Sequence, residues 1–293
     1  MNAIKRLVRR SVNSALASTR GRNFLLRSLA NDGKFVFAEC GDHSLIFDPS
    51  EFIGRQIYDS GGWQRAQTDA VIKTVRSERS EAGQASVGVF FELGANIGTQ
   101  TIYAALSGAF ERLIAVEPDP RNHALLCANL RVNGLDGCAE AIACAVSDVE
   151  GTADLRRNAL NSGTSTLRET RLEGHEASRD FLNIDYSVEV AIQRADDILG
   201  ARGVAPEDVA LVWIDVEGHE LRALKGMPEL LKARVPIQIE YSPHWFSDEE
   251  RGELVDLVHG TYGRVLLSQD GFRSISASEL RATASQIDLL LLP

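Results

Sequence analysis

Acidic residues end two apolar runs of the sequence, and the first of them is followed by a permissive turn. Glu92 closes the run VFF, and Glu117 closes the run LIAV. The turn after Glu92 contains, in order, Gly94, Asn96 and Gly98. Glycine lets a backbone fold tightly and approach a ligand with no Cβ in the way. We therefore interpret the two acids and the turn as parts of one ligand site.

The chemistry of the two acids restricts the ligand. An acid beside the turn repels an anion and attracts a cation, and an acid at the end of the second run can accept hydrogen bonds from both hydroxyls of a ribose. A dinucleotide site of the form G-x-G-x-x-G would have glycine where Asn96 stands. These features oppose a nicotinamide cofactor and favour S-adenosylmethionine, which joins a ribose to a cationic sulfonium and amino acid portion. The structural alternative is that each acid only solvates the end of a strand.

A third group of residues is suited to catalysis. The segment IDVEGHE places Asp215, Glu217 and His219 at the end of a further apolar run. Glu240 ends the next run in the same way. Imidazole has an ordinary pKa near 6.5, so His219 is a candidate general base that removes the proton of a hydroxyl acceptor. The structural alternative for Glu217 is stabilisation of a helix dipole, worth about 0.3 to 1 kcal/mol.

The same carboxylates allow a metal alternative. Asp215, Glu217 and Glu240 offer the oxygen ligands that Mg²⁺ prefers, and a bound Mg²⁺ would lower the pKa of an acceptor hydroxyl. Their spacing does not establish a metal site. We therefore assign no metal ligand from the sequence and keep Mg²⁺ as an alternative cofactor.

Strands and helices that alternate along the chain must position these residues. The runs that predict buried strands cover residues 87–93, 113–116, 139–146, 210–215 and 235–241, followed by the closing segments RVLLS and IDLLLLP. Helical patterns lie between the runs, and one begins with Asp119 as N-cap and Pro120 as first helical residue. A polar excursion over residues 158–185 is either a lid or an insertion. The alternation predicts an α/β fold with a doubly wound, mostly parallel sheet that binds ligands beyond the carboxyl ends of its strands.

The chain before this region divides into two segments. Residues 1–30 contain seven Lys and Arg, no acid, and apolar residues at helical spacing, which predicts a basic amphipathic helix or arm. Residues 31–85 predict a cap segment with a hairpin over 35–49 and a helix after Trp63, ending in a connector. We therefore expect a third part, the catalytic domain, over residues 86–293.

The charge distribution restricts the partners. The chain has 31 Lys and Arg against 41 Asp and Glu, and seven of the bases lie in residues 1–30. The acidic remainder repels phosphate backbones, which argues against nucleic acid as a partner. We expect a small-molecule or glycan acceptor, weak contact of residues 1–30 with a membrane surface, and an oligomeric state left open by the sequence.

The cysteines indicate the compartment. There are four, with no CxxC pair, which favours buried thiols in a reducing environment. We therefore expect a cytoplasmic protein, peripheral to a membrane if residues 1–30 bind one. The acid-free character of those residues is also typical of an organelle transit peptide.

Several segments together resemble one known family. They are FFELGANIGTQT, AVEPDPRNHALLCANLRVNG, NSGTSTL, ADDIL, LVWIDVEGHELRALKGM and IQIEYSP. From about FIGRQIYDSGGW to its C-terminus, the chain resembles the FkbM family of S-adenosylmethionine-dependent methyltransferases. The resemblance implies a Rossmann-like class I methyltransferase fold with a seven-stranded sheet whose last strand is antiparallel. It also implies O-methylation of a hydroxyl on a sugar, a glycolipid or a secondary metabolite.

The resemblance further implies roles for single residues. The cofactor-binding residues would be Glu92, Gly94, Asn96, Gly98, Glu117, Asp148 and Asp215. The catalytic candidates are His219, Asp215, Glu217 and Glu240. Asp148 would face the adenine amino group, with a role in the turn SDVEG as its alternative. At Glu92 the family more often has Asp. The rival functions are a catalytically silent S-adenosylmethionine-binding module and a nicotinamide-dependent oxidoreductase.

Overall fold

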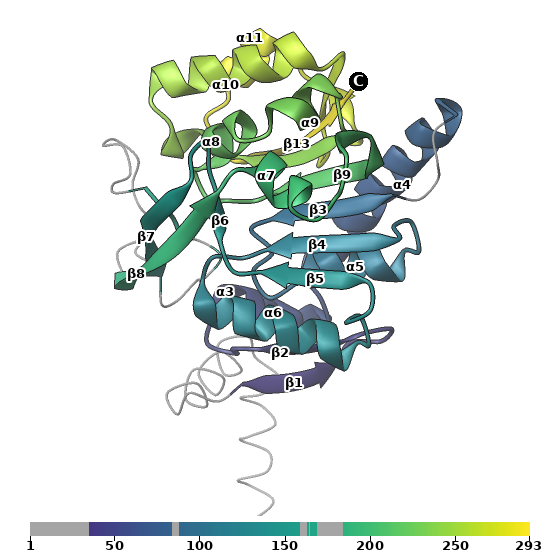
Figure 1. The fold of residues 1–293 in the computed structure, drawn as a ribbon, viewed down its shortest axis with the longest axis vertical. Coiled ribbons are helices and arrows are strands. Elements are labelled where there is room, and N and C mark those ends of the chain that lie inside the picture. The colour runs from purple at the N-terminus through teal and green to yellow at the C-terminus, as the bar shows by residue number, and fades with distance from the viewer. Residues whose placement is uncertain (1–34, 84–87, 159–162, 164, 169–183) are drawn as a thin grey trace, which may run out of the picture. The chain divides into compact units, whose positions relative to one another are not determined.

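A computed structural model of the chain shows two compact units, residues 1–63 and residues 64–293. The described residues are 35–83, 88–158, 163, 165–168 and 184–293 (Figure 1). The predicted basic arm, residues 1–30, and most of the polar excursion lie outside them.

The first unit contains the hairpin that the sequence predicts. Strand β1, Val36–Glu39, pairs antiparallel with strand β2, Ser44–Phe47. Gly41 lies between the two strands with a φ of 83°. Helix α3, Phe52–Ser60, follows the hairpin. The side chains buried in this unit include Leu45, Phe47 and Ile57.

An eight-stranded sheet lies at the centre of the second unit. Its strands have the order β12-β11-β13-β10-β9-β3-β4-β5. Their bounds are β3 Val89–Leu93, β4 Arg112–Val116, β5 Ala139–Ile142, β9 Val209–Ile214, β10 Ile237–Tyr241, β11 Arg264–Leu267, β12 Arg273–Ser274 and β13 Ile287–Leu292. The strands from β10 to β5 in this order are parallel, whereas β13 is antiparallel to both β10 and β11. The α/β class is confirmed. In this structure β13, the last strand, is antiparallel, and the two-residue β12 is an eighth strand beside the seven expected.

The predicted third strand, residues 139–146, is divided in the structure. β5 ends at Ile142, and β6, Ala145–Val146, belongs to a second sheet with the order β6-β8-β7. The chain bends between them, where the N–H of Cys144 donates to the carbonyl of Ile142 at 3.2 Å. The prediction of a single strand was wrong. Residues 141–146 are all apolar, so the sequence pattern continues through the bend.

The second sheet contains a hairpin that the sequence pattern did not predict. β7, Gly151–Asn158, pairs antiparallel with β8, Ile184–Gln193. Thr166, from the excursion between them, forms a single bridge with Arg156 of β7. In Figure 1 the arrowheads of β3, β4 and β5 point toward this hairpin, so it stands on the side of the sheet where their carboxyl ends lie.

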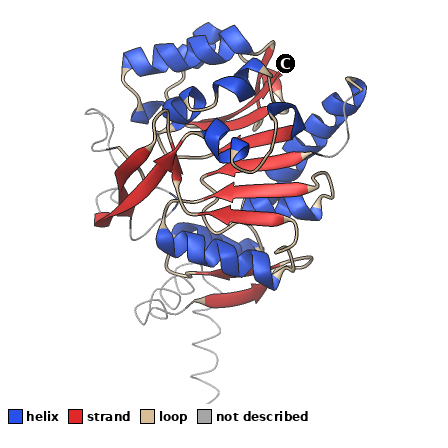
Figure 2. Cartoon of the chain, in the orientation of Figure 1, coloured by secondary structure: helices blue, strands red, loops and turns tan. Residues whose placement is uncertain are grey.

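Helices cover both faces of the main sheet (Figure 2). Their bounds are α4 Arg65–Glu81, α5 Thr99–Leu106, α6 Pro120–Val132, α7 Ala195–Gly200, α8 Glu220–Lys225, α9 Pro228–Lys232, α10 Asp248–Thr261 and α11 Ala277–Ala282. Side chains of α4 and α5 cluster with Phe90 and Trp213, whereas side chains of α7 to α11 cluster with Phe91 and Ile214. Neighbouring residues of a strand point to opposite faces, so the sheet is doubly wound, as predicted. In the described part of the chain, no helix has both the length and the apolarity to span a membrane.

Helix α4 begins after Trp63, as predicted, but continues to Glu81. The stretch expected as a connector from residue 77 is therefore helical at its start. The side chains of α4 that pack in the second unit include Val71, Ile72 and Val75. The contacts place α4 with residues 64–293, and the predicted domain boundary at residue 86 stays a prediction.

Candidate active site

The turn after β3 requires its glycines. Gly94 and Gly98 have φ angles of 87° and 91°, and Asn96 has 50°, all in the left-handed region. A Cβ on Gly94 would lie 1.8 Å from the carbonyl oxygen of Asp215, and one on Gly98 would lie 2.6 Å from Cδ1 of Leu126. Because Gly94 has no Cβ, the end of β3 can meet the end of β9.

Glu117 lies beside this turn. Its carboxylate accepts hydrogen bonds from the backbone N–H groups of Asn96 and Asp119, each at 2.8 Å. Burial raises the pKa of Glu117 to about 8, although these two hydrogen bonds act to lower it. A carboxylate offers about four acceptor positions, so Glu117 keeps capacity for further donors. The acid predicted to hold a ribose therefore stands next to the glycine turn.

Glu92 is buried and contacts helix α5. The hydroxyl of Thr101 donates a hydrogen bond to its carboxyl group. Burial raises the pKa of Glu92 to about 8, and the charges of Asp215 and Glu117 act in the same direction. The structure thus gives Glu92 a partner in α5, while its contact with the amino acid end of a cofactor stays a prediction.

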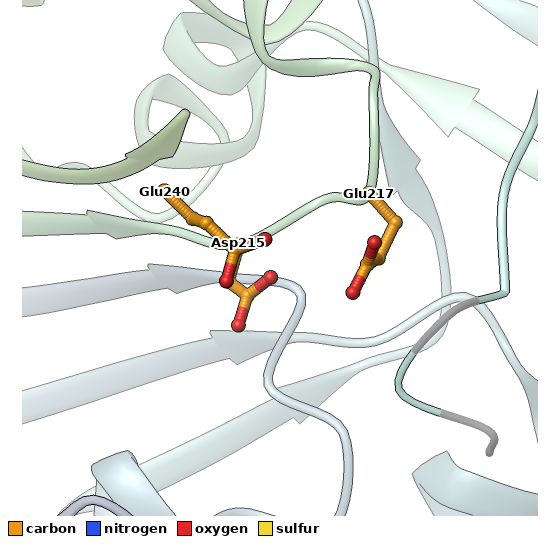
Figure 3. A group of neighbouring side chains, drawn as sticks. All are labelled: Asp215, Glu217 and Glu240. Carbon is orange, nitrogen blue, oxygen red and sulfur yellow. The ribbon is translucent and has the colours of Figure 1, made fainter. Parts of the chain in front are cut away.

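Three carboxylates from the ends of β9 and β10 meet in space (Figure 3). Asp215, Glu217 and Glu240 each place one oxygen within 4.8 Å of the other two, and we call them the carboxylate cluster. Glu240 also accepts hydrogen bonds from Ser242 at 3.2 Å and from Gln286 at 2.6 Å. Burial raises the pKa of Asp215 to about 7 and raises the pKa of Glu240 well above its ordinary value, and neighbouring acids add to both shifts. A cation bound here would relieve this repulsion.

His219 has different electrostatic surroundings. Its Nε2 lies 3.1 Å from the hydroxyl oxygen of Ser147. Burial lowers the pKa of His219 to about 4, and Arg168 and Arg222 act in the same direction. In contrast, the neighbouring charges that affect the pKa of Asp215 most are those of Asp288 and Glu220, which raise it. His219 is therefore neutral at neutral pH, and its role as general base stays a prediction.

Asp148 has a protein partner. Its carboxylate accepts a hydrogen bond from Arg222 of α8 at 2.8 Å and one from Ser147 at 3.2 Å. Burial alone would raise the pKa of Asp148, but Arg222 outweighs it and holds the pKa below its ordinary value. The expected contact of Asp148 with adenine stays a prediction.

Arg157 reaches the loop of Glu117 and was not among the predicted residues. It lies on β7 and forms an ion pair with Asp119 in which Nε and Oδ2 are 2.8 Å apart. The two side chains are only 5% and 0% exposed. Asp119 also caps helix α6 and donates its N–H to Glu117. Arg157 therefore fastens the β7–β8 hairpin to the loop that carries Glu117.

Two further contacts, from the segment between β7 and β8, reach the backbone of the turn that carries Glu217. Thr166 donates to the carbonyl of Glu217 at 2.7 Å, and Arg168 donates to the carbonyl of Gly218 at 2.6 Å. Neither residue was named individually as a site residue from the sequence, although both lie in the polar excursion. The only sequence signal was that Thr166 and Leu167 end the motif NSGTSTL.

Comparison with known proteins identifies the family. Residues 92–273 match the model described as the methyltransferase FkbM domain, which is more than half of the chain. The chain belongs to the FkbM methyltransferase family. The matched range contains the glycine turn, Glu117 and the carboxylate cluster, and it confirms the resemblance seen in the motifs.

Several curated proteins are similar to this FkbM-family chain. Methyltransferase sdnD of Sordaria araneosa is 29% identical over 47% of the chain and 60% of that protein. The 31-O-demethyl-FK506 methyltransferase FkbM of Streptomyces tacrolimicus is 30% identical over 62% of the chain and 75% of that protein. The 2-O-methyltransferase NoeI of Sinorhizobium fredii is 27% identical over 53% of the chain and 63% of that protein. The chain thus spans less than two thirds of two of these relatives.

Proposed function

We propose that this protein is an S-adenosylmethionine-dependent methyltransferase that methylates a hydroxyl oxygen of a sugar, a glycolipid or a secondary metabolite. The observation that carries the proposal is that Glu117 and the glycine turn meet at the same edge of the sheet as the carboxylate cluster. Membership of the FkbM family supports methyl transfer. The names of two relatives, which specify O-methylation, support oxygen as the acceptor atom.

The residues at this edge fit a cofactor that combines a ribose with positive charge. Glu117 has acceptor capacity for ribose hydroxyls, and the carboxylate cluster is suited to a cation. Several acids lie at this edge, and burial and their mutual repulsion contribute to the raised pKa values of Glu117 and Asp215. The pyrophosphate of a nicotinamide dinucleotide would add further negative charge there. When bound, S-adenosylmethionine supplies an activated methyl group. The chain must then hold the acceptor oxygen in line with it, an alignment worth ~7 to 11 kcal/mol in favourable cases.

The acceptor hydroxyl must also lose its proton. A base works best when its pKa is near the working pH, and the pKa of Asp215 is raised to about 7. We assign proton removal to Asp215, with Glu217 and Glu240 orienting the hydroxyl. His219, the general base expected from the sequence, has its pKa lowered to about 4 by burial and is the second candidate for this base.

A metal-assisted form of the same reaction is the alternative mechanism. The spacing of the carboxylate cluster, with oxygens within 4.8 Å of one another, is the observation that favours it. Mg²⁺ held there would lower the pKa of the acceptor hydroxyl and replace the base. In that case activity is lost with a chelator and returns with Mg²⁺.

Calorimetry tests the cofactor. We expect S-adenosylmethionine and S-adenosylhomocysteine to bind and NAD not to bind. Binding of NAD with neither of the adenosyl ligands would end the proposal in favour of an oxidoreductase.

Mass spectrometry tests the acceptor. Cell extracts incubated with the protein and methyl-labelled S-adenosylmethionine should contain a hydroxyl compound that gains the label on oxygen. Label on nitrogen would overturn O-methylation and keep methyl transfer. Cofactor binding with no labelled product in extracts or on a broad panel of hydroxyl compounds would favour the silent binding module.

A further inference from the structure

The turn that carries Glu217 has an unusual backbone. Glu217 has a φ of 47° and the following Gly218 has a φ of 89°, both in the left-handed region. This region is costly for a residue that has a Cβ, and it persists where the surrounding structure imposes it. The contacts of this turn come from the segment between β7 and β8, from Trp245 and from Glu220.

Two side chains hold consecutive carbonyls of this turn. The hydroxyl of Thr166 donates to the carbonyl of Glu217 at 2.7 Å. Nε of Arg168 donates to the carbonyl of Gly218 at 2.6 Å. The backbone of Thr166 is itself fixed, since its N–H and its carbonyl both bond Arg156 of β7, at 3.0 and 2.9 Å. The turn is therefore tied to the second sheet.

Arg168 is fixed from a third element, helix α10. Its Nη1 and Nη2 donate to the two carboxylate oxygens of Glu250 at 3.2 and 2.9 Å. Its guanidinium lies over the ring of Phe246, 5.0 Å from the centroid. This two-pronged pairing with a stacked ring holds a guanidinium plane in one orientation. The Arg168 side chain is only 18% exposed, which limits screening of the pair by solvent.

Packing closes the other side of the turn. A Cβ on Gly218 would lie 2.6 Å from Cγ of Trp245, so the indole lies directly against the glycine. The N–H of Gly218 donates to the carboxyl group of Glu220 at 3.0 Å. The turn is thus held through both carbonyls, through the Gly218 N–H and by an aromatic ring.

We propose that Thr166 and Arg168 are positioning residues that keep the Glu217 carboxylate beside Asp215 and Glu240. The inference rests on the proposed function, because it assigns the two residues a role in that reaction. The direction of a side chain follows the φ and ψ of its residue. Loss of the two carbonyl contacts lets Glu217 leave the left-handed region, and its carboxylate then turns away from the cluster.

Paired variants separate the contacts from general stability. Thr166→Val removes the hydroxyl donor at constant shape, and Thr166→Ser keeps it. Arg168→Met removes all three donor nitrogens. Arg168→Lys keeps the positive charge but cannot donate two hydrogen bonds from one planar group. The matched control is Arg264→Met, which also removes a two-pronged ion pair, here with Glu78. Arg264 begins β11, so it lies at the opposite edge of the sheet from the carboxyl ends of the parallel strands.

Three readouts are compared at a temperature where every variant is folded. Amide hydrogen exchange reports opening of residues 215–220. Calorimetry reports the affinity for S-adenosylhomocysteine. The rate of label transfer to the acceptor gives kcat and KM. We expect Thr166→Val and Arg168→Met to exchange faster in residues 215–220 and to lose about 10- to 100-fold in kcat, with cofactor affinity within about threefold of wild type.

The controls decide the outcome. Thr166→Ser should restore both exchange and kcat, and Arg264→Met should change neither. Unchanged exchange in Thr166→Val and Arg168→Met overturns the inference, and so does faster exchange with unchanged kcat. If the wild type transfers no methyl group, the proposed function fails, and the exchange measurements still decide whether the two residues hold the turn.

Discussion

The Glu117 carboxylate accepts a hydrogen bond of 2.8 Å from the backbone N–H of Asn96. A residue at the end of β4 thereby fixes the turn that follows β3, and the same side chain is the candidate ligand for a ribose. In the proposed function, the same carboxyl group would both support the turn and bind the ribose.

Replacement of Glu117 should weaken cofactor binding. In Glu117→Ala, the ribose loses its acceptor and the turn loses the contact with Asn96. A ribose can place two hydroxyls on Glu117, and each hydrogen bond contributes about 0.5 to 1.5 kcal/mol, so we expect the Kd for S-adenosylhomocysteine to rise by roughly 5- to 150-fold. Calorimetry measures it. Glu140→Ala, which removes a carboxylate of β5 paired with Arg112 and Arg202, is the control and should leave the Kd unchanged. Wild-type affinity in Glu117→Ala would contradict the ribose assignment.

The base can be assigned by two variants. If Asp215 removes the proton, Asp215→Asn should lower kcat by about 10²- to 10⁴-fold, and His219→Ala should lower it far less. The result is reversed if His219 is the base. The rate of methyl transfer from labelled cofactor gives kcat for both variants. The same assay with a chelator tests the metal alternative. Full activity in both variants would place the reaction at another strand end.

Stability should fall as pH rises from 6.5 to 8. Burial raises the pKa of Glu92 and Glu117 to about 8 and the pKa of Asp215 and Glu220 to about 7. The unfolded chain has already lost these protons above pH 6.5, so the folded chain binds more protons and loses them across this range. Each such group lowers the free energy of unfolding by at most about 1.4 kcal/mol per pH unit. His219 has the opposite effect, but below pH 6.5, because its pKa is lowered to about 4.

Thermal unfolding of the cofactor-free protein measures this dependence. The Tm should be lower at pH 8 than at pH 6.5. Glu92→Gln removes one of the titrating groups and keeps an acceptor for Thr101, so it should flatten the dependence. A Tm that is constant or rises over this range would show that these carboxyl groups are ionised in the folded chain.

The buried ion pair of Arg157 and Asp119 should be costly to break. Arg157→Met leaves the Asp119 carboxylate, 0% exposed, without its counter-charge. We expect a loss of about 3 to 5 kcal/mol in the free energy of unfolding, measured with urea. The double variant with Asp119→Asn removes the charge but keeps an oxygen for the cap of α6, and it should recover part of the loss. A loss below about 1 kcal/mol, typical of an exposed pair, would show that water reaches the site.

Much of the architecture could be predicted because its signals are local. Apolar runs of strand length and helical spacing between them indicated the parallel sheet, and Asp119 followed by Pro120 indicated the start of α6. The break between β5 and β6 could not be predicted, since residues 141–146 are all apolar, although Ala143 at the bend is exposed in the structure. The pairing of β7 with β8 depends on a contact across an excursion without periodicity.

The candidate site also combines features that the sequence shows with contacts that only the structure shows. The sequence by itself determined that acids end the apolar runs at Glu92, Glu117 and Glu240, because strand ends are readable from neighbouring residues. Only the tertiary structure decided what each side chain meets. It joined Glu92 to α5, and it brought Arg168 to a carbonyl 50 residues further along the chain. Partners of this kind depend on how distant elements pack, and no local pattern carries that information.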